Sequence, residues 1–327
     1  MKLVRLLLPI IILSSCSTKT TTLKEVQEFI KVEETKDILF TLASDEMKGR
    51  ESSNGGYQMA ADFVTNFFEE NGIEPFYPAY KDSLQTKEVW SYNLVGRIGS
   101  FDNEKPTILI GAHLDHIGVN EENHEDPIFN GANDNASGST AVLQIAEFLA
   151  TKEWNQNIIV ALFADEEKGL RGAAHLAERL KEEGVSLAYM VNFEMLGTTL
   201  SASENYVYES NATPPGQAGR VYMTGYDISD MPEKMNTYTP EFIQFLPEAK
   251  QYNLFRRSDN YSFYKIHNIP AQTLSTFDFK NYDYYHKAGD EAEKLDVTNM
   301  NQVIRTSAYV LAKMFEEEVS INLISEE

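Results

Sequence analysis

Three apolar runs separated by longer amphipathic segments constrain the fold of this chain most strongly. The runs span residues 107–112 (TILIGA), 157–164 (NIIVALFA) and 187–193 (LAYMVNF). Their length and nearly continuous hydrophobicity are typical of strands that are buried on both faces. Residues 137–150 and 169–183, which lie between them, have apolar positions at helical spacing. This alternation predicts an α/β fold, a three-layer α/β/α sandwich around a twisted, mixed but mostly parallel sheet.

Helical spacing also marks the two ends of the chain. Apolar residues recur at helical intervals over residues 23–72, interrupted by a loop at 48–56, and residues 297–317 read as a final amphipathic helix. Weaker strand candidates are residues 221–224 and 271–276. The sequence contains no internal repeat and no low-complexity linker, which favours one domain.

The first sixteen residues have a different character. Lys2 and Arg5 precede an apolar run at residues 6–13 that is too short to cross a bilayer. Residues 13–16, Leu-Ser-Ser-Cys, resemble the bacterial lipobox, whose cysteine becomes the lipid-modified first residue of the mature protein, and Cys16 is the only cysteine. The expected organisation is a lipoprotein signal peptide at residues 1–15, a tether at 16–22 and a single domain at 23–327.

The charge balance limits the partners that this chain can have. It contains 28 basic and 50 acidic residues, a formal charge of −22. Such a surface repels the phosphates of nucleic acids, so no nucleic-acid partner is expected, and the charge is interpreted as serving solubility. A lipid on Cys16 would attach the protein to a membrane of the cell envelope, at the periplasmic face or in the outer membrane. The sequence leaves the oligomeric state open.

Metal-binding side chains follow each of the three apolar runs. The first run leads into His113 and Asp115, the second into Glu166 and Glu167, and the third into Glu194. Because the carboxyl ends of parallel strands meet at one edge of a sheet, these side chains are expected to converge. Imidazole and carboxylate groups bind zinc, and two zinc ions about 3.5–4 Å apart need a carboxylate that reaches both.

Two further segments add donors of the same kind. Residues 131–138 (GANDNASG) place Asp134 in a loop of small residues just before a helix. Tyr285 and His286 lie in a polar, aromatic loop near the C-terminus. The sequence therefore predicts a metal site that draws on five separate segments.

With these segments in order, the sequence resembles the di-zinc aminopeptidases of metallopeptidase family 28. The motifs are H-x-D, G-A-N-D-N-A-S-G, D-E-E-x-G-L-x-G, N-F-E-M-x-G and Y-H, and the resemblance extends from the GRESSNGG loop to the final helix. It implies a zinc-exopeptidase-like fold and a zinc-dependent aminopeptidase, a metallo-exopeptidase that hydrolyses the N-terminal residues of peptide substrates. Two zinc ions per chain are expected.

The resemblance also assigns a role to each matching residue. His113 and Glu194 would bind the first zinc, Glu167 and His286 the second, and Asp134 would bridge the two. Glu166 would be the general base that takes a proton from the attacking, metal-bridging water. Asp115 would orient His113 through its other ring nitrogen, and the hydroxyl of Tyr285 would stabilise the developing oxyanion. Asp259, in a segment that often reads S-D-H, would be an acid near the base.

The sequence departs from the family pattern at two of these positions. Glu194 stands where many members have Asp, so its reach and its number of metal contacts are open, and Asn260 replaces the more usual His after Asp259. The resemblance further implies a cis peptide bond between Asp134 and Asn135. Of the other histidines, His116 is interpreted as lining the site rather than binding metal.

Two alternative functions are compatible with the same residues. A glutaminyl cyclase on this fold resembles the chain around the metal ligands, but such relatives tend to carry an insertion after the glutamate pair and to use one zinc. Here residues 168–172 lead directly from Glu167 into the helix, which favours hydrolysis. The second alternative is a non-catalytic surface protein that binds peptides or another partner.

Overall fold

The computed structural model describes residues 20–85, 90–201 and 218–324. The expected signal peptide, Cys16 and most of the expected tether lie outside these ranges and stay predictions. Residues 86–89, 202–217 and 325–327 lie outside them as well. Among the described helices, none combines the length and the apolar character that crossing a membrane requires.

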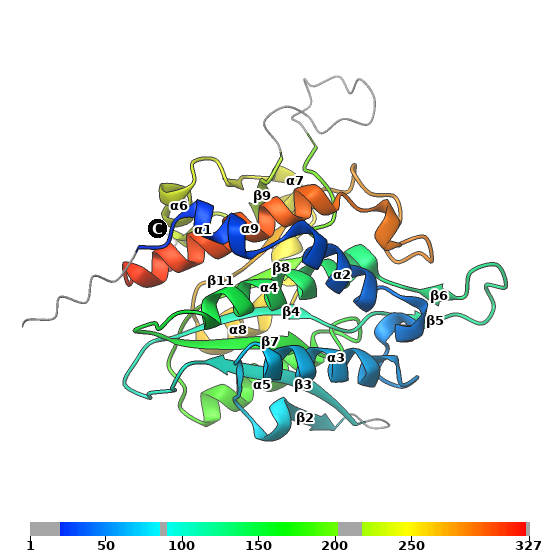
Figure 1. Ribbon diagram of the computed structural model, residues 1–327, viewed down its shortest axis with the longest axis horizontal. Helices are drawn as coiled ribbons and strands as arrows, with labels where there is room; N and C mark the ends of the chain where they lie inside the picture. Colours follow the sequence, from blue (N-terminus) through cyan, green and yellow to red (C-terminus); the bar gives the residue numbers. More distant parts are fainter. Residues whose placement is uncertain (1–19, 86–89, 202–217, 325–327) are drawn as a thin grey trace, which may run out of the picture.

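A single large sheet forms the centre of the molecule (Figure 1). Its strand order is β1-β3-β7-β4-β8-β11-β9-β10, and β2 pairs with the outer side of β3. The neighbours β7, β4, β8 and β11 run parallel, whereas β3 is antiparallel to the strands beside it. β9 is antiparallel to β11 and parallel to β10. The central strands are β4 (Thr107–His113), β7 (Asn157–Phe163), β8 (Leu187–Glu194) and β11 (Ala271–Ser275). The predicted mixed, mostly parallel sheet is confirmed.

The strand register brings the functional ends of these strands level with one another. His113 of β4 pairs with Phe163 of β7, two residues before Asp165, and Glu194 of β8 pairs with Ser275 of β11. All the predicted donors that follow a strand therefore leave the sheet at the same edge.

Helices cover both faces of the sheet, as Figure 1 shows. On one face lie α2 (Val32–Leu42), α3 (Gly56–Glu70), α4 (Gly138–Ala150) and α9 (Val297–Glu316). On the other face lie α5 (Arg171–Glu182) and α8 (Asn260–His267). Alternate residues of β4 belong to the two hydrophobic cores, one on each face of the sheet. Ile108 and Ile110 pack under the first set of helices and Leu109 under the second. The three-layer architecture follows from this burial on both faces.

The remaining elements are short. The other helices are α1 (Leu23–Phe29), α6 (Met231–Tyr238) and α7 (Pro247–Gln251), with single turns η1 (Asp45–Arg50), η2 (Pro78–Tyr80), η4 (Leu254–Arg256) and η5 (Ala292–Lys294) and the irregular segment η3 (Ala132–Ser137). The other strands are β1 (Glu74–Pro75), β2 (Lys81–Gln85), β3 (Trp90–Ile98), β5 (Gly118–Val119), β6 (Ile128–Phe129), β9 (Val221–Met223) and β10 (Ile243–Gln244).

The helices and strands predicted from residue 107 onward are present within one or two residues of their expected ends. The helical stretch predicted at 23–72 is instead divided into α1, α2 and α3, with α2 ending at Leu42 and α3 beginning at Gly56. The antiparallel edge formed by β1, β2 and β3 and the short helices α6 to α8 were not predicted from the sequence. Local signals explain some of the observed ends. Thr22 and Glu25 form a capping box at the start of α1, and the carboxylate of Asp296 accepts a hydrogen bond from the Asn299 N–H at the start of α9.

Candidate metal centre

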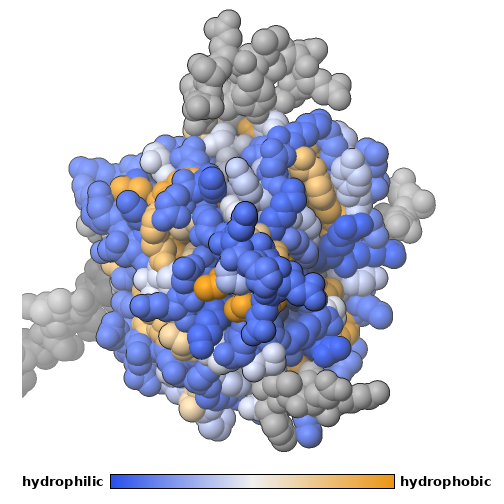
Figure 2. All heavy atoms as spheres, turned by 90° about the vertical axis from the view of Figure 1, so that its right-hand side faces the viewer, coloured by the Kyte–Doolittle hydropathy of each residue, from blue (hydrophilic) through white to orange (hydrophobic). Residues whose placement is uncertain are grey.

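The predicted ligands meet at the carboxyl end of the parallel strands. In Figure 1 this end is on the right, where β4 leads into the β5–β6 hairpin. Figure 2 looks onto the same end, where the visible surface is mostly hydrophilic with small groups of hydrophobic residues between. The elements that contribute donors are β4, η3, the turn after β7, the end of β8 and the loop before η5.

The first set of donors consists of His113, Asp134 and Glu194. The Nε2 atom of His113 lies 3.2 Å from Asp134 Oδ1 and 3.3 Å from Glu194 Oε1. His113 and Asp134 are almost completely buried, and the three ligand atoms lie within 4.8 Å of one another. Separations of this size between donors match two ligands of one zinc ion at bond lengths of about 2.0–2.2 Å.

A second set of donors uses the other oxygen of Asp134. The Nε2 atom of His286 lies 3.1 Å from Asp134 Oδ2 and 3.1 Å from Glu167 Oε2. Asp134 therefore presents one oxygen to each set, which is the arrangement that a carboxylate bridge between two ions requires. All five residues predicted as metal ligands are thus brought together, and their nitrogen and oxygen donors suit zinc.

Electrostatic interactions bind these groups to one another. Burial alone would lower the pKa of His286, but the carboxylates of Asp134 and Glu167 raise it to about 10. Burial also acts to lower the pKa of His113, but the charges of Glu194 and Glu166 raise this pKa well above its usual value. A cation at either set would compete with the protons on these imidazoles. Metal affinity is therefore expected to fall as the pH is lowered.

His116 is a further histidine in the second set, and the sequence did not predict it as a ligand. Its ring is buried, and Nδ1 lies 2.7 Å from Glu167 Oε1 and 4.0 Å from Asp134 Oδ2. The ligand atoms of His116, Asp134 and Glu167 all lie within 4.8 Å of one another. The signal in the sequence was its position three residues after His113 at the end of the same strand.

The loop that carries Asp134 is fixed by hydrogen bonds to buried side chains. The carboxylate of Asp290 accepts the N–H groups of Asn133 and Asp134 at 2.7 and 3.1 Å and the hydroxyl of Tyr282 at 2.5 Å. The peptide bond between Asp134 and Asn135 is cis, as expected. Asp290 follows His286 by four residues, but nothing in the sequence pointed to its contact with the Asp134 loop.

The side chain of Asn135 joins the same loop to the end of β8. Its Oδ1 accepts the N–H groups of Gly138 and Met195, both at 3.0 Å, and its Nδ2 donates to the carbonyl of Phe193 at 3.0 Å. Because Glu194 stands between Phe193 and Met195, these bonds set the distance between Asp134 and Glu194.

Asp115 supports the site differently from the way the resemblance implied. The Nδ1 atom of His113 hydrogen-bonds with the backbone carbonyl of Asp115 at 3.1 Å, while the Asp115 carboxylate lies 3.7 Å away. That carboxylate instead accepts the backbone N–H groups of Glu166 at 3.1 Å and Glu167 at 3.4 Å. Asp115 thus holds both the first histidine and the glutamate pair.

Glu166 and Asp259 are the two predicted acids beside the donor sets. Burial raises the pKa of Glu166 well above its usual value, and the charges of Glu194 and Asp259 act in the same direction against His113. Asp259 is fully buried, and neither of its carboxylate oxygens has a hydrogen-bond partner among the described residues. Burial likewise raises the pKa of Asp259 well above its usual value. A carboxyl group with a raised pKa is suited to taking up and releasing a proton near neutral pH.

Arg50 connects three of the segments that surround the site. It is completely buried and donates four hydrogen bonds, all to backbone carbonyls: Leu42 at 2.6 Å, Leu114 at 2.8 Å, Asn130 at 2.7 Å and Gly131 at 2.8 Å. Burial lowers its pKa to about 10, so it stays charged at neutral pH beside the acids of the site. The sequence marked its loop but gave no role to this side chain.

Tyr285 lies at the surface beside the second donor set. Its ring stacks on His286 with ring centres 4.0 Å apart and is 42% exposed. Phe277 packs against Tyr285 at 5.4 Å, Phe279 against Phe277 at 4.6 Å, and Tyr252 against Phe279 at 4.9 Å. A continuous row of aromatic rings therefore extends from His286 to Tyr252.

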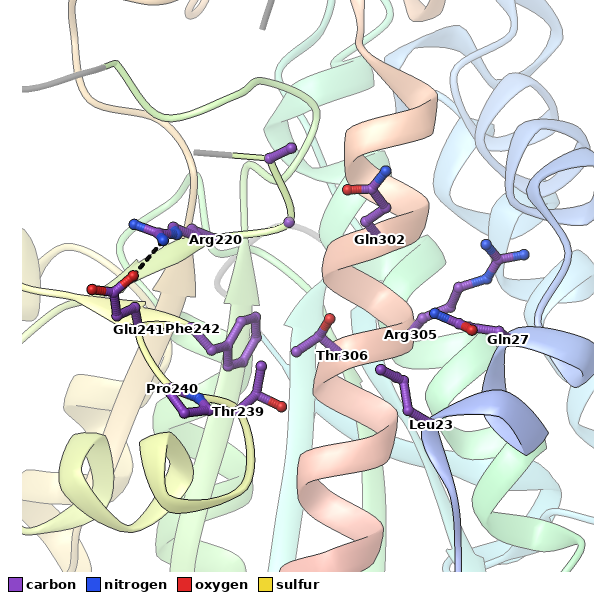
Figure 3. Close-up of a pocket in the computed structure, with 12 residues that line it drawn as sticks. Leu23, Gln27, Arg220, Thr239, Pro240, Glu241, Phe242, Gln302, Arg305 and Thr306 are labelled. Atoms are coloured by element: carbon purple, nitrogen blue, oxygen red, sulfur yellow. Dashed lines mark hydrogen bonds and ion pairs between the residues drawn. The ribbon is translucent and has the colours of Figure 1, made fainter. Parts of the chain in front are cut away.

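A separate hollow lies away from these residues. Figure 3 shows it between α1, α9 and the segments around Arg220 and Phe242, with Arg220 paired to Glu241 at its rim. It has a volume of about 370 Å³, and none of the predicted site residues lines it. The hollow contributes nothing to the metal centre.

Known proteins resemble this chain in sequence and in fold. Residues 93–311 match the sequence profile of Peptidase family M28. An aminopeptidase of Pseudomonas aeruginosa is 32% identical over 139 residues, 40% of this chain and 24% of that protein, so the chain spans about a quarter of this relative's length.

Two solved structures have the same fold at low sequence identity. The LapA aminopeptidase of Legionella pneumophila superposes with a TM-score of 0.69 at 19% identity, covering 91% of this chain and 76% of that one. A glutaminyl cyclase of Porphyromonas gingivalis superposes with a TM-score of 0.63 at 15% identity, covering 89% and 99%. With the family profile matched over more than half of its length, the chain belongs to Peptidase family M28.

Proposed function

We propose that this protein is a zinc-dependent aminopeptidase that removes N-terminal residues from peptides. The observation that carries the proposal is the division of Asp134 between two donor sets. One oxygen faces His113 and the other faces His286, each at little more than 3 Å. This arrangement provides for two ions that share a carboxylate, and membership of Peptidase family M28 supports peptide hydrolysis.

The donor sets fit zinc in both chemistry and spacing. Nitrogen and oxygen ligands at these separations suit Zn²⁺. Within residues 20–85, 90–201 and 218–324, the buried nitrogens of His116 and the Glu167 Oε1 atom have no hydrogen-bond partner. His113, Asp134 and Glu194 would hold one ion, and Asp134, Glu167 and His286 the other. Bound zinc would polarise the scissile carbonyl and lower the pKa of the attacking water.

The protein's own groups carry the proton transfers. Glu166 accepts a proton from the attacking water at its carboxylate and delivers it to the leaving amine. The hydrogen bonds from the N–H groups of Glu166 and Glu167 to Asp115 keep the base in place beside the donor sets. The hydroxyl of Tyr285 stabilises the negative charge that develops on the carbonyl oxygen. The free amine of the substrate is recognised by the acidic groups around the ions.

A glutaminyl cyclase remains the alternative, because an enzyme of that kind has the same fold. One feature favours the peptidase. The turn after Glu167 occupies only residues 168–170 before α5 begins at Arg171, and it leaves no room for the insertion expected of a cyclase.

The test compares both reactions in purified protein. We expect hydrolysis of leucyl- or alanyl-arylamides, loss of this activity with a chelator and its return with zinc. Replacement Glu166→Gln should lower kcat by at least about 100-fold, since general acid–base catalysis contributes about 10²–10⁴-fold, and should leave zinc content unchanged. The matched control is Glu178→Gln on the exposed side of α5. Release of ammonia from glutaminyl peptides without hydrolysis would identify a cyclase, and the absence of both activities would favour a binding protein.

A further inference from the structure

The ring of His116 is buried beside the second donor set without a hydrogen bond. Neither Nδ1 nor Nε2 has a hydrogen-bond partner of acceptable geometry among the described residues, and Glu167 Oε1 has none either, although Nδ1 lies 2.7 Å from it. The two atoms are in close contact without the alignment of a hydrogen bond. Buried polar atoms without partners are rare in folded proteins and call for an explanation.

Close packing holds the imidazole in this position. A Cβ atom on Gly131 would lie 2.5 Å from the ring atoms Cγ and Cδ2 of His116, so only glycine leaves room for the ring there. Gly131 also has a φ of +57°, a conformation that glycine adopts without strain. On another side the ring meets that of His286 edge-on, with centres 5.8 Å apart. Packing contacts thus hold the His116 ring against that of His286.

Two ligands of one metal ion have this kind of contact. Each directs a lone pair at the ion rather than at the other ligand, so the donors lie close together without hydrogen-bond geometry. His116 Nδ1 and Glu167 Oε1 meet this description, and Asp134 Oδ2 lies 4.0 Å from the same nitrogen. A hydrogen bond that merely orients Glu167 would instead place the oxygen on the N–H axis.

We propose that His116 is a fourth protein ligand of the second metal ion, through Nδ1. The inference rests on the proposed pair of ions. The second ion would then be held by His116, His286, Asp134 and Glu167, whereas the first would have only His113, Asp134 and Glu194. Zinc sites with four protein ligands are closed, and sites with three keep a position for water or substrate. The two ions would therefore differ, the second being tightly held and the first being the one with an open position.

Cobalt spectroscopy tests this ligand directly in the full-length protein. In a His116→Cys variant loaded with Co²⁺, the thiolate should bind the metal and produce a thiolate-to-cobalt charge-transfer band that the wild type lacks. The wild type already contains Cys16, so it corrects for that thiol. The matched control is His124→Cys, whose position is exposed in the β5–β6 hairpin and should give no band.

Metal binding gives a second measurement. Titration with a competing chelator should show two zinc ions of unequal affinity in the wild type. Replacement His116→Gln should weaken the tighter one by about 10–100-fold or more, since even changes beside a metal ligand cost that much. His124→Gln should change neither. In the wild type, the zinc ion that is lost first should be the one bound by the donor set that contains His113.

If the variants fail to fold, a zinc-edge anomalous map of the wild type tests whether His116 is a ligand. Two zinc ions with His116 Nδ1 at about 2.0–2.1 Å from one of them support the proposal. Two zinc ions with this nitrogen beyond bonding distance, or a His116→Cys protein that binds cobalt without a charge-transfer band, overturn it while leaving the peptidase proposal intact. Fewer than two ions in the wild type would overturn both.

Discussion

Glu194 uses its two carboxylate oxygens for different purposes. Oε1 faces His113 in the first donor set, while Oε2 accepts a hydrogen bond from the hydroxyl of Ser258 at 2.5 Å. Ser258 is in turn hydrogen-bonded to Asn192 of β8. The longer side chain, which departs from the Asp common in the family, thus reaches the site and is held there from the opposite side. One oxygen is left for a metal ion, so Glu194 is expected to bind through a single atom.

Replacement Glu194→Asp is predicted to weaken zinc binding at the first site. The shorter side chain withdraws the carboxylate by about one carbon–carbon bond and cannot keep both of its contacts. We expect the affinity of the weaker zinc to fall by about 10–100-fold, the range seen for disturbed metal surroundings. Chelator competition measures it, with Glu178→Asp on the surface of α5 as the matched control. An unchanged affinity would mean that the backbone adjusts or that Glu194 is not a ligand.

The candidate metal ligands could be predicted from the sequence, whereas the residues that support them could not. His113, Glu167 and Glu194 each follow an apolar run, and the topology of a parallel sheet brings such positions together. Arg50 and Asp290 bind backbone carbonyl and N–H groups. Because almost every residue carries such groups, the sequence does not indicate which residues these two side chains contact. The resemblance to a known family supplied the roles of Asp134 and His286, which local patterns alone would not have distinguished from other loop residues.

At the scale of the helices and strands, Arg50 connects the N-terminal helices to the edge of the sheet where the donor sets lie. Its guanidinium binds the end of α2, the residue after β4 and the segment before η3. Nearby, Ser52 donates to the carboxylate of Asp165 at 2.8 Å, and Lys168 binds Glu51 and Ser52. The loop at residues 48–56 is therefore hydrogen-bonded to the segments that follow β4 and β7, where candidate metal ligands lie.

Removing the Arg50 guanidinium is predicted to destabilise the fold and the metal site together. Replacement Arg50→Met leaves buried carbonyls without a donor, at about 1–3 kcal/mol for each group that stays unpaired. We expect the free energy of unfolding in urea to fall by roughly 3 kcal/mol or more. Arg50→Lys should recover only part of this, because an ammonium group cannot reproduce the planar fork.

A surface arginine provides the comparison for this effect. Arg97 pairs with Glu74 at 2.9 Å at an exposed edge of the sheet. Arg97→Met should therefore cost no more than about 1 kcal/mol. Equal losses in the two variants would show that the four carbonyl contacts of Arg50 contribute little.

At the scale of the whole molecule, stability is expected to depend on pH through ion pairs between the buried Asp82 and two partly exposed cationic side chains of α5. Asp82 of β2 is fully buried and lies 3.2 Å from His175 and 2.8 Å from Arg179, both of α5. Burial would raise the pKa of Asp82, but His175, Arg179 and Asn93 lower it below 3.8. The nearby Asp82 carboxylate raises the pKa of His175 above 6.5.

The two shifts define a pH window of greatest stability. The contribution of Asp82 is present above its unfolded pKa near 3.8 and is lost as the pH falls through its lower folded value. The contribution of His175 is fully present below its unfolded pKa near 6.5 and is lost as the pH rises through its higher folded value. His175→Gln should therefore lower the thermal unfolding midpoint most at about pH 5–6, with the difference disappearing in alkaline solution. A loss that is the same at every pH would assign the effect to packing, and exposed His124→Gln should show none.

The donors of the metal centre are spread over most of the polypeptide, from His113 at the end of β4 to His286 shortly before the last helix. Synthesis proceeds from the amino end, so a growing chain cannot complete the second donor set until the loop before η5 has emerged. The first donor set lacks Glu194 until β8 has been made. The sheet therefore has to form before either group of donors can be complete.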